Sequence, residues 1–236
     1  MGQDMKILIM TGGRIDEDFA FSFLEREHFE HIIVVDGALA FWDKVETNIR
    51  INISFDHLVG DFDTISPDIL EKYLKRGNIE IHRFNPEKDY TDTDIALKLA
   101  IRMGEQEIKK NGSEEDVEIT LLGATGTRAD HMLANLQLLE QTRAAGMSGV
   151  IVDRNNRIRL IEGRFILKKS EQFGYYVSLI PVSEELKAVT LKGFKYPLDR
   201  YAVHLGQSIC VSNELEADEG EIVIEEGKAF LIESRD

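Results

Sequence analysis

The sequence predicts an α/β domain built on a mostly parallel sheet, followed by an all-β domain with antiparallel strands. Over residues 1–153, short β-rich runs alternate with longer helical patterns, which is typical of a parallel sheet covered by helices on both faces. From residue 154 onward, β-rich runs follow one another at about ten-residue spacing, as in a sandwich or a partial barrel. The polar segment DRNNR, residues 153–157, marks the boundary, so we expect domains at 1–153 and 154–236.

Six runs rich in branched apolar residues predict the strands of the first domain. KILIM and HIIVVD are examples, because each is mostly apolar, as expected for strands that are buried on both faces of a parallel sheet. The predicted strands cover residues 6–10, 31–36, 57–59, 79–84, 117–122 and 149–153.

The segments between these strands have helical patterns. In the fourth, an apolar stripe that includes Ile95, Leu99 and Met103 recurs at the spacing of one helical turn. In the third, Ser66 before Pro67 is a helix-start signal, because proline favours the first helical position. The predicted helices cover residues 16–27, 38–47, 67–76, 92–109 and 130–145.

Short runs of β-branched and aromatic residues predict the strands of the second domain. The single cysteine, Cys210, falls in one of these runs, where a buried and unreactive thiol is expected. One cysteine cannot form an internal disulfide, which favours a reducing compartment, the cytoplasm. The predicted strands cover residues 157–162, 165–168, 175–180, 188–191, 208–212, 222–225 and 229–232.

The composition is that of a globular protein with an acidic surface. Hydrophobic residues make up 43% of the chain and charged residues 30%, which is ordinary for a folded domain. The net charge of −15 argues against a nucleic-acid partner, whose phosphates would need a basic face. No apolar run approaches the roughly 18 residues that a membrane span requires, so no membrane partner is expected.

Acidic and glycine residues gather where the predicted strands end, which is the edge of a parallel sheet that binds ligands. Asp36 ends the second strand, and the segment GDFD, residues 60–63, ends the third. The fourth strand is followed by KDYTDTD, residues 88–94, and the fifth by GATGTRAD, residues 123–130. We therefore expect the functional site at this edge.

Asp61 and Asp63 are separated by one residue, and two carboxylates so close repel each other unless a cation lies between them. If the strand continues through them, its two-residue period points both carboxylates to one side and Phe62 to the other. Metal or phosphate binding is the favoured interpretation, and a turn or a helix cap is the alternative. Asp92 follows Thr91 at a helix start, so it is either part of a cap or a further ligand of the same cation.

The segment GATGTRAD is a glycine-bearing turn between a strand and a helix. Its backbone N–H groups and the helix N-terminus suit a phosphate, and Arg128 adds a planar positive charge, although a purely structural turn is equally consistent. The TGG segment at residues 11–13 has the same two interpretations. His131 is expected to be an ordinary first-turn helix residue, and six scattered histidines without paired spacing do not predict a zinc site.

These motifs, in this order and spacing, resemble the thiamin pyrophosphokinase family across most of the chain. The family's pattern contains Asp-Gly-Gly-Ala-Asn, Gly-Asp-Phe-Asp-Ser-Ile, Lys-Asp-x-Thr-Asp-Thr, Gly-Gly-Arg-x-Asp-His, and a late Gly-Leu-Lys-Trp/Tyr-Pro-Leu followed by Ser-Asn. In the first loop, Ala38-Leu39-Ala40 replaces Gly-Ala-Asn, and Thr127 replaces a glycine in the helix entry, so details of substrate contact differ. The matching segments are DGA (36–38), GDFDTI (60–65), KDYTDT (88–93), GTRADH (126–131), GFKYPL (193–198) and SN (212–213).

The resemblance implies a Rossmann-like α/β domain, a C-terminal β-sandwich, and a homodimer with active sites at the subunit interface. It also implies a Mg²⁺-dependent reaction in which ATP and thiamin give AMP and thiamin diphosphate. The alternatives are a pyrophosphokinase for another hydroxymethyl substrate, or a non-catalytic protein that binds a nucleotide or thiamin. A metal-dependent phosphatase is disfavoured, because its Asp-x-Asp pair usually follows the first strand, whereas here the pair follows the third.

Residues at the strand ends are expected to bind the metal and the phosphates. We assign magnesium to Asp61, Asp63 and Asp92. Asp36 and Asp130 orient the substrates, or one of them accepts the hydroxyl proton, and the sequence does not choose between these roles. The residues assigned to ATP and its phosphates are Lys88, Thr91 and Arg128.

Thiamin is a cation with two flat rings, and the resemblance implies that the second domain binds it. Tyr196 could stack on such a ring, and the alternative is an aromatic of the core or of a subunit interface. Ser212 and Asn213 are expected to form hydrogen bonds with the pyrimidine.

Overall fold

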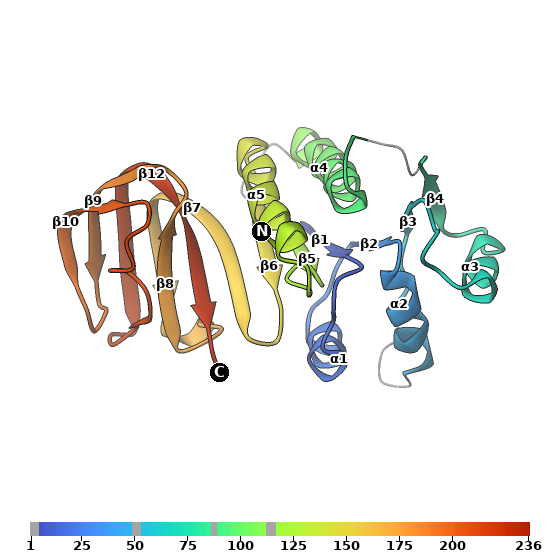
Figure 1. Cartoon of the computed structure of the whole chain (residues 1–236), viewed down its shortest axis with the longest axis horizontal. Coiled ribbons are helices and arrows are strands. Elements are labelled where there is room, and N and C mark those ends of the chain that lie inside the picture. The colour runs from blue at the N-terminus through green and yellow to red at the C-terminus, as the bar shows by residue number, and fades with distance from the viewer. Residues whose placement is uncertain (1–4, 49–52, 86–88, 112–116) are drawn as a thin grey trace. The chain divides into compact units, whose positions relative to one another are not determined.

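The protein is described by a computed structural model that covers residues 5–48, 53–85, 89–111 and 117–236. The chain forms two compact units, Met1–Arg154 and Asn155–Asp236. The first unit is mixed α/β and the second consists of antiparallel strands, so the predicted fold class is confirmed (Figure 1). In the described segments, no helix has the length and apolar character needed to cross a membrane.

Strands and helices alternate along the first unit, and every element predicted there is present with ends that differ by at most two residues. The strands are β1 (Met5–Met10), β2 (His31–Val35), β3 (His57–Gly60), β4 (Glu80–Arg83), β5 (Val117–Leu122) and β6 (Ser148–Val152). The helices are α1 (Glu17–Arg26), α2 (Ala38–Thr47), α3 (Pro67–Leu74), α4 (Asp92–Asn111) and α5 (Ala129–Ala144).

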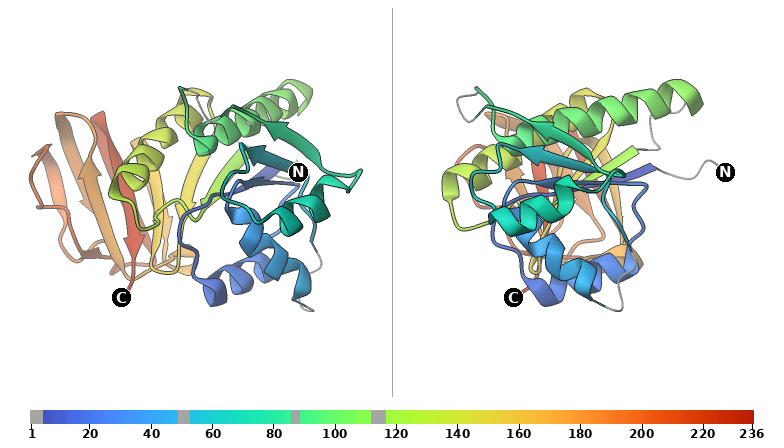
Figure 2. Two further views of the ribbon diagram at one scale, coloured as in Figure 1. Left: turned by 45° about the vertical axis from the view of Figure 1, so that its right-hand side comes forward. Right: turned by 90° about the vertical axis from the view of Figure 1, so that its right-hand side faces the viewer.

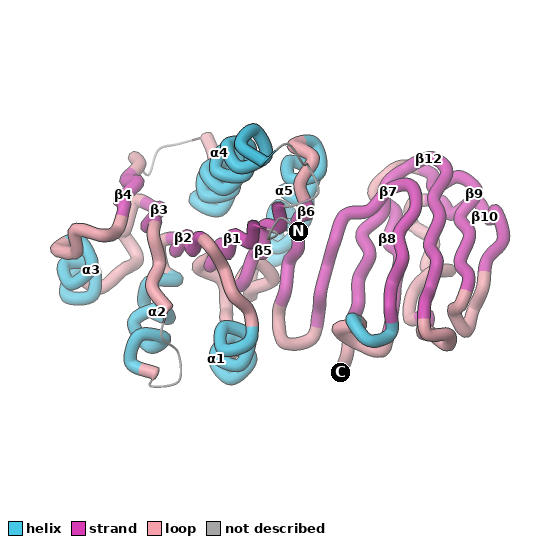
Figure 3. Tube along the Cα trace, turned by 180° about the vertical axis from the view of Figure 1, so that it is seen from behind, coloured by secondary structure: helices cyan, strands magenta, loops and turns pink. Residues whose placement is uncertain are grey.

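The strands of the first unit pair in parallel in the order β6–β5–β1–β2–β3–β4. Helices α4 and α5 cover one face of this sheet, and α1, α2 and α3 cover the other (Figures 1 and 3). Figure 2 shows the same layers from two further directions. Because both faces are covered, Ile7, Leu8 and Ile9 of β1 have no exposed surface. The strand order reverses between β1 and β5, which is where open α/β sheets bind ligands.

Two of the helix starts show how local sequence sets the ends of helices. The Asp16 side chain caps α1 by accepting a hydrogen bond from the backbone N–H of Phe19 at 2.9 Å. Ser66 precedes α3 with extended backbone, but its hydroxyl forms no capping hydrogen bond. The start of α3 therefore depends on Pro67, whose fixed φ suits the first helical position.

The second unit is organised around one long strand, β12 (Glu219–Ser234), which pairs with β7 (Asn156–Lys168) over almost its whole length. The first half of β12 also pairs with β9 (Glu185–Lys192), and the second half pairs with β8 (Tyr176–Pro181). Strand β10 (Leu198–His204) pairs with β9, and β11 (Asn213–Glu214) pairs with β8. A short 3-10 turn, η1 (Lys169–Glu171), follows β7. The buried side chains form one hydrophobic core, in which the Cys210 thiol is buried as expected.

Two pairs of predicted strands in this unit are each a single strand. Residues 157–162 and 165–168 belong to β7, and residues 222–225 and 229–232 belong to β12. Gly163 and Gly227, which the sequence suggests are turns, lie inside these strands with φ of 66° and 108°. The register of β12 against β7 shifts between Ile224 and Ala229. Gly227 lies within this shift and allows the long strand to bend, so that its two halves pair with different strands.

One predicted strand of the second unit is wrong, and two observed strands, β10 and the two-residue β11, are not predicted. Residues 208–212 form turns and bends, with Ile209 and Val211 exposed rather than packed in a sheet. Strand β10 has only one buried side chain, Val203, so its sequence lacks the alternation of apolar and polar residues that reveals a strand.

Candidate active site

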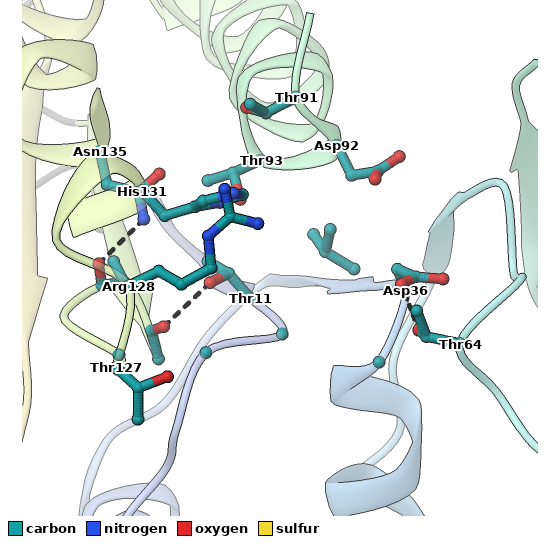
Figure 4. Close-up of a pocket in the computed structure, with 17 residues that line it drawn as sticks. Thr11, Asp36, Thr64, Thr91, Asp92, Thr93, Thr127, Arg128, His131 and Asn135 are labelled. Atoms are coloured by element: carbon teal, nitrogen blue, oxygen red, sulfur yellow. Dashed lines mark hydrogen bonds between the residues drawn. The ribbon is translucent and has the colours of Figure 1, made fainter. Parts of the chain in front are cut away.

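A pocket of about 540 Å³ lies at the carboxyl ends of the parallel strands (Figure 4). Its walls are the loops that follow β1, β2 and β5, at residues 11–13, 36–37 and 123–128, together with the first turns of α4 and α5. This is the edge of the sheet at which the acidic and glycine-bearing motifs are expected to meet.

Two glycine-bearing loops, after β1 and after β5, interlock at the floor of this pocket. A side chain on Gly13 would place its Cβ 2.1 Å from the carbonyl oxygen of Gly123, and one on Gly126 would lie 2.7 Å from the backbone nitrogen of Arg14. Thr11 ties the loops together, since its hydroxyl donates to the Gly123 carbonyl at 3.0 Å. The glycines are therefore required for close backbone approach, while a contact with phosphate remains a prediction.

Three carboxylates converge beside the pocket. Oxygen atoms of Asp36, Asp61 and Asp63 lie within 4.8 Å of one another. Asp36 Oδ2 accepts a hydrogen bond from the Thr64 hydroxyl at 2.5 Å, whereas Asp36 Oδ1 is buried and has no hydrogen-bond partner in the described structure (Figure 4). A group of three carboxylates, one of which has a buried and unpartnered oxygen, fits an oxygen-preferring divalent cation.

The backbone brings these carboxylates together by a turn, because the third strand does not continue through Asp61 and Asp63 and strand alternation therefore does not set their directions. Strand β3 ends at Gly60, and Phe62 adopts a left-handed conformation with φ of 67° while its ring is buried. The backbone N–H of Asp63 then donates to Asp61 Oδ1 at 3.2 Å. Gly60 is required for the approach to β2, because a side chain there would place its Cβ 3.0 Å from the Cβ of Asp36.

Repulsion among these groups is visible in the pKa of Asp63, which is raised chiefly by the charge of Asp61 and further by Asp36 and Asp92. Asp92 lines the pocket at the start of α4, but it is not one of the three residues with oxygens within 4.8 Å. Thr91 caps this helix, since its hydroxyl accepts from the backbone N–H of Asp94 at 3.2 Å. A cation held by the three carboxylates would relieve the repulsion that raises the pKa of Asp63.

Arg128 faces the pocket from the residue that precedes α5, and its guanidinium pairs with Asp130 at 2.6 Å. Both side chains are about two-thirds exposed. The hydrogen bond from Arg128 lowers the pKa of Asp130 to about 2, so Asp130 is ionised across the physiological range. Lys88, also expected to contact phosphate, lies outside the described residues.

The sequence did not indicate three further residues that line the pocket. His131 lies in the first turn of α5 but also faces the pocket. Asn135 is buried and donates from its side-chain amide to the Ala124 carbonyl at 2.9 Å, which holds the loop after β5. Thr64 orients Asp36, and its position directly after the GDFD segment is the one sequence signal that could have revealed it.

Both units of the chain match families of known function. Residues 24–151 match the thiamin pyrophosphokinase catalytic domain, and residues 164–229 match the thiamin pyrophosphokinase vitamin B1 binding domain. A thiamine pyrophosphokinase of Bacillus subtilis is 34% identical over 178 residues, which cover 75% of this chain and 77% of that protein.

The chain belongs to the thiamin pyrophosphokinase family. Members of this family are enzymes, and the similarity extends to eukaryotes. Thiamine pyrophosphokinase 1 of Oryza sativa is 27% identical over 72% of this chain, and the matched segment spans 62% of the rice protein.

Solved structures of thiamin pyrophosphokinases have the same fold. The Bacillus subtilis enzyme superposes with a TM-score of 0.79 at 31% identity, covering 98% of this chain and 99% of that one. The Geobacillus thermodenitrificans enzyme has a TM-score of 0.75 at 29% identity and covers 98% of both chains. The Candida albicans enzyme, at 19% identity, shares the fold with a TM-score of 0.77 over 99% of this chain and 90% of its own.

In the second unit, the residues expected to bind thiamin, Tyr196, Ser212 and Asn213, lie close together. Tyr196 is 58% exposed, and its backbone N–H and carbonyl are both hydrogen-bonded to the side-chain amide of Asn213, at 3.0 and 2.8 Å. The Asn213 oxygen also accepts from the N–H of Glu214 at 2.9 Å. Asn213 is buried and its amide is occupied by backbone, so it holds the Tyr196 loop in place, while Ser212 is exposed beside it.

Proposed function

We propose that this chain catalyses Mg²⁺-dependent transfer of a pyrophosphoryl group from ATP to the hydroxyl of thiamin, which yields thiamin diphosphate and AMP. The observation that carries the proposal is the group of three converging carboxylates beside a glycine-lined pocket, in a chain that belongs to the thiamin pyrophosphokinase family. Pyrophosphoryl transfer depends mainly on alignment and on neutralising charge on phosphoryl oxygens, and this arrangement provides for both.

In this proposal, Asp36, Asp61 and Asp63 hold magnesium, and Asp92, whose charge contributes to the raised pKa of Asp63, contributes through water. The donor set fits, because Mg²⁺ prefers carboxylate oxygens and the unpartnered Oδ1 of Asp36 needs a positive partner. When bound, the metal neutralises charge on the phosphoryl oxygens of ATP.

Other residues of the first unit would bind the phosphates of ATP and activate the thiamin hydroxyl. Arg128 would exchange its exposed partner Asp130 for a phosphate oxygen, at the positive N-terminus of α5. Asp130, released by this exchange, would orient the thiamin hydroxyl or accept its proton, because Asp36 is assigned to the metal.

We assign thiamin binding to the second unit. The exposed ring of Tyr196 offers a flat face to a cationic heterocycle, and exposed Ser212 offers a hydroxyl. Homodimerisation and a cytoplasmic location remain predictions, from the family resemblance and from the single cysteine respectively. Sedimentation equilibrium of the full chain tests the first of these.

The decisive experiment measures AMP formation from ATP and thiamin with and without Mg²⁺, in the full chain and in Asp61→Asn. We expect the substitution to lower kcat at least about 100-fold, because it weakens charge neutralisation at the reacting phosphate. Asp68→Asn is the matched control, since Asp68 is an exposed carboxylate in the first turn of α3. A folded Asp61→Asn protein with near wild-type turnover would contradict the assignment.

The acceptor is tested separately with a panel of hydroxymethyl heterocycles. Thiamin should give the highest kcat/KM, and Tyr196→Ala should raise the KM for thiamin more than it lowers kcat. Preference for another alcohol would identify a pyrophosphokinase with a different substrate, and the absence of AMP with every acceptor would indicate a non-catalytic binding protein.

A further inference from the structure

A second group of potential metal ligands lies at the opposite ends of the strands from the pocket. His57 is the first residue of β3, and its register partner Glu80 is the first residue of β4. His82 lies two residues further along β4. We infer that His57, Glu80 and His82 bind a zinc ion. This inference does not depend on the proposed function.

The two histidine nitrogens and the Glu80 carboxylate lie at distances close to those between ligands of one zinc ion. His57 Nδ1 lies 3.1 Å from His82 Nε2 and 3.6 Å from Glu80 Oε2, and His82 Nε2 lies 3.4 Å from Glu80 Oε1. Zinc with bonds of about 2.0–2.1 Å to nitrogen and oxygen places tetrahedral ligands about 3.3 Å apart. Two imidazoles and one carboxylate form a known zinc donor set that leaves one position open to water.

The surroundings of the three residues also favour a cation. The His57 and His82 side chains are only 13% and 19% exposed, while Glu80 is 65% exposed and leaves one side open to solvent. Asp56 and His31 lie beside this group, with His31 Nδ1 buried without a hydrogen bond and 3.5 Å from Asp56 Oδ2.

The two candidate cation sites share one short strand but differ in chemistry. Asp61 follows His57 by four positions of extended chain, which is a distance of about 13 Å. Nitrogen ligands favour zinc, and an all-oxygen set favours magnesium, so each site selects its own ion.

A metal at this position would join the outermost strand of the parallel sheet to the strand beside it. Strand β4 has four residues, pairs with β3 alone among the residues that the structure describes, and is half-exposed or exposed at every position. The alternative is a direct hydrogen bond between the two imidazoles, which would need no metal. The two cases differ in whether zinc raises the thermal stability of the protein.

The test uses the untagged full chain, stripped with a chelator and titrated calorimetrically with ZnCl₂ in excess MgCl₂. We expect one zinc per chain and a rise in melting temperature. Glu80→Gln and His82→Gln should each weaken zinc binding at least about tenfold and abolish most of the thermal shift. Cobalt in place of zinc should give the intense visible bands of a tetrahedral complex in the wild type and lose them in His82→Gln.

Two controls separate this site from others on the chain. His204→Gln removes a histidine whose Nε2 lies 3.9 Å from Glu185 Oε1 in the second unit, and should leave zinc binding unchanged. Asp61→Asn should also keep zinc, because its carboxylate belongs to the acidic group. No zinc binding in the presence of Mg²⁺, or equal binding in wild type and His82→Gln, would overturn the inference. Loss of zinc in Asp61→Asn would overturn it as well.

Discussion

At the scale of single residues, Phe62 determines where two carboxylates point. Its left-handed backbone is unfavourable for a bulky side chain, and the buried ring compensates by anchoring the turn. Asp61 and Asp63 on either side are thereby held near Asp36 although their mutual repulsion opposes it. Backbone strain and charge crowding are thus concentrated at the position where a cation is expected.

This crowding predicts that Asp63 destabilises the protein when no metal is bound. Because its pKa is raised in the folded state, the folded chain binds this proton more tightly than the unfolded chain does, and stability is lost as pH rises through the raised pKa. Metal-free Asp63→Asn should therefore melt at a higher temperature than wild type at pH 7. The difference should vanish as pH falls below the ordinary value of 3.8.

Calorimetric melting in the presence of a chelator measures this effect. A second series of melts with Mg²⁺ measures how much the metal stabilises each protein. Magnesium should raise the melting temperature of wild type and of Asp68→Asn but not that of Asp63→Asn. Equal magnesium shifts in all three proteins would contradict the role assigned to the acidic group.

Arg128 is the second residue whose role can be measured directly. Its side chain is exposed and paired only with a neighbour on the same turn, so its removal should not affect folding. We expect Arg128→Ala to raise the KM for ATP about 10- to 100-fold, the value of a charge-assisted hydrogen bond. Steady-state kinetics at varied ATP concentration measures this KM. An unchanged KM would show that Arg128 does not contact ATP.

At the scale of elements, the two loops that form the pocket floor fit each other only through glycine. Gly126→Ala would place a methyl group 2.7 Å from the backbone nitrogen of Arg14. We expect a loss of about 1–3 kcal/mol in the free energy of unfolding, together with weaker ATP binding. Urea denaturation measures the first, and Gly77→Ala is the control because nothing lies within 4 Å of its added Cβ. If Gly126→Ala and Gly77→Ala were equally stable, the two loops at the pocket floor could move apart to accommodate the methyl group at little cost.

Elements of the first unit could be predicted closely because its buried strands are mostly apolar runs that alternate with helical patterns. In the second unit, Gly163 and Gly227 resemble turns in the sequence but lie within bent strands, and this depends on pairing with distant neighbours. The same limit applies to the candidate sites. Adjacent acidic residues are visible in the sequence, whereas His57, Glu80 and His82 become neighbours only when β3 and β4 pair.

Side-chain roles were harder to predict than side-chain positions. Asn213 lies beside Tyr196, as its motif suggests, but its amide is hydrogen-bonded to backbone on both sides. Asp36 joins the acidic group through the approach of β2 and β3 at Gly60, which no local pattern reveals.

At the scale of the whole molecule, the long strand β12 makes the second unit depend on one buried carboxylate near its end. The Glu233 side chain is 1% exposed and accepts hydrogen bonds from Arg157, Arg159 and the backbone N–H of Phe173. These contacts join β12 to β7 and to the chain that leads into β8, so all three segments share one charge network.

Glu233→Ala should therefore cost about 3–5 kcal/mol in the free energy of unfolding, because it removes a buried carboxylate that accepts hydrogen bonds from two arginines, each only about one-fifth exposed. Glu221→Ala is the matched control: Glu221 also lies on β12 and contacts two cations, Arg164 and Lys192, but is 24% exposed. We expect a cost of about 1 kcal/mol or less there. Guanidinium unfolding followed by circular dichroism measures both, and similar costs would mean that burial of Glu233 is unimportant.

The interlocked loops at the pocket floor also have a consequence for the order of events during biosynthesis. Strands β1 and β5 are neighbours in space, yet more than a hundred residues lie between them along the chain. On the ribosome, the loop at residues 11–13 emerges early but cannot form its contacts with the second loop until residues 123–128 have been translated. We expect a nascent polypeptide arrested before that point to bind no nucleotide, even though most of its helices are already synthesised.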